Sequence, residues 1–207
     1  MKKTIKMLGL IFVAACLFAG CANSSDSNDD KSSASKNLTK PLFDTDELTE
    51  NVSIIDLADG KWIYRTVAEY EDSTTISDEF SFTVKDMKVD ESADYSYKCA
   101  YKSKIPADFT EEDKAMYKKN GFTFEGAYMI QNDSFSKAEI QHPAPENAHI
   151  PGNVNYIISK INELPQNKGG SYKTNSDYTR YYFSDTGTKE SEGTMYDGII
   201  DYYLAKN

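Results

Sequence analysis

The sequence predicts a mainly β protein built around an antiparallel sheet. Three observations lead to this fold class. Most apolar stretches alternate apolar and polar residues with a period of two, which is typical of half-buried strands. Turn-forming residues separate these stretches, and only two segments show helical spacing. About seven strands joined by short turns indicate an antiparallel barrel or sandwich. A β-rich α+β fold with an antiparallel sheet is the alternative.

The alternation defines the strands in order. Residues 61–71 place five side chains on one face: Trp62, Tyr64, Thr66, Ala68 and Tyr70. Residues 79–85 alternate Phe80, Phe82 and Val84 with polar positions. Residues 94–102 put Tyr95, Tyr97, Cys99 and Tyr101 on one face. Further strands are predicted at 122–130, 135–141, 178–184 and 194–205, with turns at 132–133, 169–170 and 185–187.

Two helices are predicted among the strands. Thr110 is a suitable N-cap before three acidic residues, and Lys118 and Lys119 suit the last turn before Gly121. The low apolar content of this helix predicts a surface position. The second helix, residues 154–164, has an apolar stripe and ends before Pro165. We expect that stripe to pack on the open end or the outer face of the sheet.

The N-terminus has the layout of a secretory leader. Lys2, Lys3 and Lys6 precede an uncharged apolar run, and small residues stand before Cys21. The run is about a dozen residues long, which is short against the roughly 20 residues of a spanning helix. The segment Leu-Phe-Ala-Gly-Cys resembles the lipobox of bacterial lipoproteins. That resemblance implies cleavage before Cys21 and acylation of its thiol and new amine. Cys16, a plain secretory signal and an uncleaved anchor are the alternatives.

These features divide the chain into a signal peptide (1–20), a polar tether (21–40) and a globular domain (41–207). The tether is nearly devoid of large apolar residues, so we expect it to be disordered. The lipoprotein resemblance implies a location in the bacterial cell envelope. Ala22 after the cysteine favours the outer membrane or the cell surface over the inner membrane.

The composition limits the partners of the chain. The 207 residues include 23 basic and 33 acidic ones, and loss of the leader removes three lysines. The net negative charge of the protein repels the phosphate backbone of nucleic acids. We therefore do not expect nucleic-acid binding. Membrane attachment would then depend on the acyl chains of Cys21. Cys99 is the only cysteine left for the domain, so no internal disulfide is expected. We expect the Cys99 side chain to be buried and to act as a small hydrophobic residue. We also expect the protein to be a monomer.

Two short motifs resemble those of the lipocalin family. Gly60-Lys61-Trp62 matches the G-x-W that opens the first lipocalin strand, and residues 48–59 before it are predicted to be non-strand. Ser176-Asp177-Tyr178 with Tyr181 is similar to the T-D-Y-x-x-Y motif, with Ser in place of Thr. The resemblance implies a lipocalin-like barrel around a pocket for small apolar ligands. It gives Trp62 a structural role in closing the base of that barrel.

Tyrosine is unusually abundant, with 15 copies. On the inward face of a barrel, five of them are candidate ligand-binding residues for a small apolar or amphiphilic molecule: Tyr64, Tyr70, Tyr95, Tyr97 and Tyr101. The alternative is that they are half-buried strand residues that suit a pleated surface.

The sequence offers few residues for metal binding or catalysis. His142, Glu146 and His149 lie in one Pro-containing loop, but their spacing matches no common metal motif, so no metal or other cofactor is expected. No nucleophile elbow, zinc-protease motif or phosphate-binding loop occurs, so we do not expect an enzyme. Two functions remain. One is a lipid-anchored binding protein; the other is a surface lipoprotein that acts as an interaction or adhesion module through loops 72–78 and 141–153.

Overall fold

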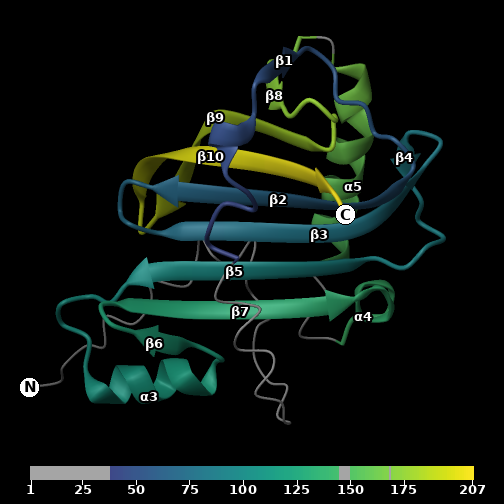
Figure 1. Cartoon of the computed structure of the whole chain (residues 1–207). Helices are drawn as coiled ribbons and strands as arrows, with labels where there is room; N and C mark the ends of the chain where they lie inside the picture. Colours follow the sequence, from purple (N-terminus) through teal and green to yellow (C-terminus); the bar gives the residue numbers. More distant parts are fainter. Residues whose placement is uncertain (1–37, 145–149, 168) are drawn as a thin grey trace, which may run out of the picture.

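A single antiparallel sheet forms the body of the protein. The computed structural model describes residues 38–144, 150–167 and 169–207. The sheet order is β1-β8-β9-β10-β2-β3-β5-β7-β6, with β4 paired beside β3. The sheet does not close, because β1 and β6 stand at its two ends (Figure 1). The prediction of a mainly β, antiparallel fold is confirmed, and the curled, open sheet is barrel-like.

The strands of this sheet are β1 (Glu50–Val52), β2 (Gly60–Tyr70), β3 (Thr75–Lys85), β4 (Lys88–Val89), β5 (Ser96–Lys104), β6 (Thr123–Glu125), β7 (Tyr128–Ser136), β8 (Tyr172–Thr174), β9 (Arg180–Ser191) and β10 (Thr194–Lys206). The described helices are α3 (Glu111–Lys119), α4 (Lys137–Gln141) and α5 (Ile150–Glu163), with short 3₁₀ turns η1 (Thr45–Glu47) and η3 (Leu164–Gln166). Within the described ranges, no helix has the length and apolar character needed to cross a membrane.

Several predicted elements match the structure closely. β2, β5 and β10 lie where the alternation placed them. α3 begins with a capping box between Thr110 and Asp113 and has lysines in its last turn, as its sequence predicts. α5 buries the predicted apolar stripe, including Val154, Ile158 and Ile161, but it begins four residues earlier than predicted and packs on the inner face of the sheet, not on the outer face. α3 has no buried residue, which agrees with a surface position.

Other predictions were wrong, and each has a local cause. Residues 122–130 form a β6–β7 hairpin, because Gly126 adopts a positive φ of 58° and reverses the chain. β7 then continues through the predicted turn at 132–133, since nine residues of it pair with β5. Of the predicted strand 135–141, the first two residues end β7 and the rest form α4, because Ser136 and Glu139 form a capping box.

The predicted turn at 185–187 is also wrong. These residues lie inside β9 and pair with β10, and the hairpin reverses later, between Ser191 and Thr194. Glu192 and Gly193 both have positive φ there, as a tight two-residue hairpin turn requires. Residues 48–59, predicted to be free of strand, contain the short strand β1.

The two faces of the sheet are covered differently. The inner face, which includes Trp62, Phe80 and Tyr97, forms the main core with α5. The outer face, which includes Arg65, Ser77 and Glu79, is crossed by residues 38–48, hereafter the strap. In Figure 1, α5 stands behind the sheet and the strap crosses in front of it. The buried indole of Trp62 donates from Nε1 to the Ala58 carbonyl at 2.8 Å.

The strap is held by a polar cluster on the outer face. The Leu38 side chain is buried, and its carbonyl accepts from Ser77 Oγ at 2.8 Å. Arg65 donates to the Lys40 carbonyl at 3.1 Å and forms a buried ion pair with Glu79. Glu79 also accepts from Lys98 Nζ at 3.0 Å. Glu79 therefore forms ion pairs with two basic side chains of the outer face, and one of these, Arg65, also holds the strap.

Candidate functional site

A cleft of about 550 Å³ lies between α5 and the inner face of the sheet. We call it the aromatic cleft, because seven aromatic side chains line it: Tyr64, Tyr70, Tyr97, Tyr156, Tyr172, Phe183 and Tyr202. Its volume is within the range of about 300–1,000 Å³ that is usual for small-molecule sites. α5 covers only part of the inner face, so the cleft remains open to solvent.

Strand pairing explains how these side chains gather on one face. Thr66 of β2 pairs with Asp78 of β3 on one side and with Tyr202 of β10 on the other. Tyr202 pairs in turn with Phe183 of β9. Because directly paired residues point to the same face of a sheet, these four side chains line the same cleft. The aromatic wall is continuous: the rings of Phe183 and Tyr202 are parallel, with centroids 4.4 Å apart.

Asp78 is the acidic residue on the floor of the aromatic cleft. Its carboxylate accepts a hydrogen bond from Tyr97 Oη at 2.5 Å and a weaker one from Thr66 Oγ1 at 3.5 Å. Burial raises the pKa of Asp78, and these two hydrogen bonds offset only part of that effect. In the described part of the chain, Asp78 forms no ion pair with a basic side chain.

The tyrosines around Asp78 are held in their neutral form. Desolvation by burial raises the pKa of Tyr97 and of Tyr64, and the nearby Asp78 charge raises both further. Tyr70 shows the same direction for the same two reasons. These side chains therefore present neutral rings and hydroxyl groups to the cleft at any physiological pH.

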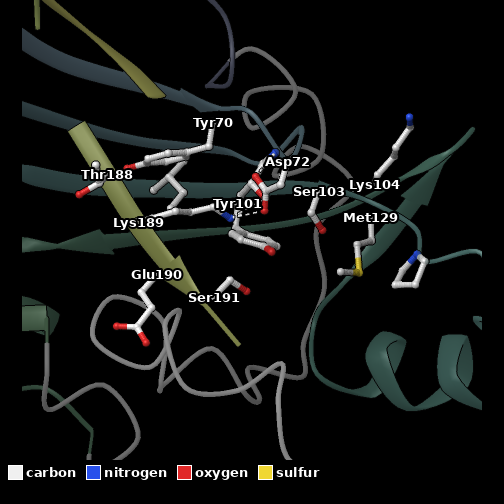
Figure 2. A pocket seen from close by; sticks show the side chains of 13 residues that line it. Tyr70, Asp72, Tyr101, Ser103, Lys104, Met129, Thr188, Lys189, Glu190 and Ser191 are labelled. Carbon is white, nitrogen blue, oxygen red and sulfur yellow. Dashed lines mark hydrogen bonds and ion pairs between the residues drawn. The ribbon is translucent and has the colours of Figure 1, made fainter. Parts of the chain in front are cut away.

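A second cavity of about 380 Å³ continues along the inner face toward the β2–β3 turn. Tyr70 and Ile76 line both spaces. Figure 2 shows Lys189 extending from β9 toward Asp72, with which it forms an ion pair of 2.7 Å. Lys189 Nζ also lies over the ring of Tyr70, 5.4 Å from its centroid. The ammonium group of Lys189 is thus already paired with neighbouring side chains and is not a free charge for a ligand.

This second cavity also shows how strongly the sheet curls. Lys189 of β9 and Met129 of β7 both line it, although four strands separate β9 from β7 in the sheet. In a flat sheet, strands five steps apart are separated by roughly 24 Å. Side chains from both strands nevertheless line one cavity, which agrees with an inner face that lies on the inside of a curved sheet (Figure 2).

The predicted ligand-binding tyrosines are distributed over this face. Tyr64, Tyr70 and Tyr97 line the aromatic cleft, and Tyr101 lines the second cavity. Tyr95 lines neither of these two spaces; it packs against Phe80, with ring centroids 5.6 Å apart.

Sequence reasoning missed Asp78 and the contribution of β9 and α5. A signal for Asp78 was present. Extending the alternation of Phe80, Phe82 and Val84 backwards by two residues places this aspartate on the apolar face. The predicted strand began at residue 79, four residues after the start of β3, and residues 72–78 were predicted to be a loop, so Asp78 was excluded.

The other singled-out residues lie as follows. Cys99 is buried and has no disulfide. His142 is exposed at the end of α4, and among the described residues no group of His, Cys, Asp and Glu is arranged to hold a metal ion. Cys16, Cys21, Glu146 and His149 lie outside the described residues.

The chain was compared with protein-family models, with curated proteins and with solved structures. None of the three comparisons gave a match.

Proposed function

We propose that the chain is a lipid-anchored binding protein of the bacterial cell envelope whose aromatic cleft takes a small apolar or amphiphilic molecule. The observation that carries the proposal is the cleft itself. It combines an aromatic lining with a few polar groups at fixed positions, which is the usual composition of a small-molecule site. A protein that served only as an interaction module would be expected to present such residues as an exposed patch over a filled core, not around a cleft of about 550 Å³.

The polar groups of the cleft favour an amphiphile over a purely apolar ligand. Asp78 stands on the floor, and the hydroxyl groups of Thr66 and of several tyrosines accompany it. Burying an apolar molecule against them would remove water from these groups without replacing its hydrogen bonds. A ligand with one polar end and an apolar body avoids that penalty.

A ligand-binding test can use two tyrosines that are adjacent in the sequence. Tyr202 faces the aromatic cleft, whereas Tyr203 faces outward and packs against Phe43 of the strap. We expect Tyr202→Leu to weaken the binding of an uncharged fluorescent amphiphile such as N-phenyl-1-naphthylamine, and Tyr203→Leu to leave it unchanged. Binding that is not saturable, or that both variants affect equally, would favour the interaction module instead.

The anchor is tested separately, in cells of a bacterial host. The lipobox resemblance predicts that the native protein partitions into the detergent phase and that Cys21→Ser moves it to the aqueous phase. Cys16→Ser is the matched control, because that cysteine belongs to the predicted leader and is expected to have no effect. Detergent partitioning that depends on Cys16, or on neither cysteine, contradicts the anchor.

A further inference from the structure

The aromatic cleft has an unbalanced charge. Its lining contains three acidic residues, Asp78, Glu163 and Asp185, and one basic residue, Lys160. Lys160 Nζ is 3.6 Å from the Glu163 carboxylate, on the same helix, and lies over the ring of Tyr156. This pair leaves the cleft with two further carboxylates, one on the floor and one exposed at the rim of β9.

The aromatic rings add to this negative potential. The face of an aromatic ring carries partial negative charge and attracts cations. Phe183 and Tyr202 stack in parallel, and Tyr172 meets Phe183 edge to face at 5.1 Å, so the wall opposite α5 is made of rings. Tyr64 continues the wall toward the core, 6.4 Å from Tyr202 between centroids.

Asp78 retains the capacity to bind a ligand. An ionised carboxylate has two oxygens and about four acceptor sites. Tyr97 takes one site on Oδ1, and the 3.5 Å contact from Thr66 on Oδ2 is long for a hydrogen bond. The side chain is only partly buried, because the cleft leaves it in contact with solvent. An entering donor can therefore reach it.

From this arrangement we propose that the aromatic cleft selects organic cations, with Asp78 as the counter-charge of an ammonium group and the aromatic wall as the seat of the apolar body. This inference rests on the proposed function, and it adds the charge of the ligand. The low polarity of the site strengthens the pairing, because a partly buried carboxylate without a basic partner is stabilised by an arriving positive charge. The raised pKa of Asp78 agrees with a carboxylate that lacks such a partner.

The test compares three probes of nearly equal size and different charge: 1-naphthylmethylamine, 1-naphthalenemethanol and 1-naphthoate. Binding is measured by isothermal titration calorimetry at neutral pH with the folded wild-type protein. We expect the amine to bind about tenfold more tightly than the alcohol, and the carboxylate to bind most weakly.

A matched pair of variants assigns the preference to one carboxylate. Asp78→Asn preserves the size of the side chain and removes its charge. Asp201→Asn is the control, because Asp201 also accepts a hydrogen bond from a tyrosine, Tyr182 Oη at 2.8 Å, but belongs to the outer face. We expect the first variant to bind the amine and the alcohol equally, and the second to keep the wild-type ratio. Circular dichroism confirms that each variant is folded.

The outcomes separate the two proposals. An amine preference that is lost only in Asp78→Asn supports the inference. An equal affinity of wild-type protein for amine and alcohol overturns it, as does a preference that survives in Asp78→Asn; in both cases the cleft still binds and the proposed function stands. If the wild-type protein binds none of the three probes, the proposed function is itself contradicted.

Discussion

The buried ion pair on the outer face allows a stability prediction to be worked from the structure. The side chains of Arg65 and Glu79 are only 10% and 6% exposed. Glu79→Gln keeps the shape and one acceptor oxygen but removes the carboxylate charge that faces the buried guanidinium. Breaking such a pair from one side costs about 3–5 kcal/mol. Because the amide oxygen can still accept one hydrogen bond, we expect about 3 kcal/mol of lost unfolding free energy.

The assay is urea unfolding followed by circular dichroism. Glu47→Gln is the control, since Glu47 forms a similar ion pair with Arg180 at 2.8 Å but both side chains are largely exposed, at 65% and 42%. Exposed pairs contribute about 0–1 kcal/mol, so the control should change little. If Glu79→Gln is no more destabilising than Glu47→Gln, the outer-face cluster does not have the energetic role assigned to it.

The same pair gives a pH dependence with a definite sign. Burial alone would raise the pKa of Glu79, but hydrogen bonds and charge from Arg65 and Lys98 bring it below its usual value. A carboxyl group with a lowered folded-state pKa contributes stability above its unfolded pKa and loses that stability as the pH falls through the folded value. Wild-type protein should therefore lose stability below about pH 4.5, and Glu79→Gln should lose less over that range.

Three further predictions concern the inner face. Asp78→Asn should raise the melting temperature at about pH 7, because burial raises the pKa of Asp78 and so makes its ionisation in the folded state unfavourable. This gain in melting temperature should shrink as the pH falls toward the ordinary aspartate pKa of 3.8. A lower melting temperature of the variant at pH 7 would contradict the reasoning. Gly198→Ala should cost about 1–3 kcal/mol in urea unfolding, because its new Cβ would come 2.5 Å from the Tyr70 ring and 2.7 Å from a backbone oxygen. Gly187→Ala, which meets only one flexible side chain, should cost less, and the reverse order would refute the argument. Cys99 should react with a thiol reagent only as fast as the protein unfolds, because it is buried; fast, complete labelling of folded protein would count against this.

The strands that sequence reasoning located best have a period-two pattern along their whole length. β2 and β5 are examples: both bury one face in the core, so their inward residues are apolar or aromatic almost without interruption. α3 and α5 were equally recognisable, one from its caps and the other from its apolar stripe.

The elements that could not be predicted depend on pairing between distant residues. Asn132 and Asp133 are turn formers by composition, but β5 supplies paired backbone along the whole of β7, and this overrides the local preference. The segment 185–187 is similar, because β10 pairs with it on both sides of Gly187. In both cases, backbone pairing with a neighbouring strand stabilises the extended conformation, and the local sequence does not reveal that neighbour.

The candidate site was predicted only in part, because some of its residues are brought together by pairing between distant strands. Alternation alone placed Tyr64, Tyr70 and Tyr97 on inward faces, and these residues do line the aromatic cleft. The other wall comes from β9, β10 and α5, whose neighbours are set by register and by the curl of the sheet. Tyr95 has the right phase but lies just before β5, where it packs against the core away from either cavity.

The position of the strap determines which face of the protein is turned toward a surface when the protein is immobilised through its N-terminus. Leu38 and Lys40 are hydrogen-bonded to the face of the sheet opposite the aromatic cleft. The described chain therefore begins, at Leu38, on the face of the sheet opposite the aromatic cleft. Immobilisation through the N-terminus should therefore leave the mouth of the cleft accessible to molecules arriving from solution.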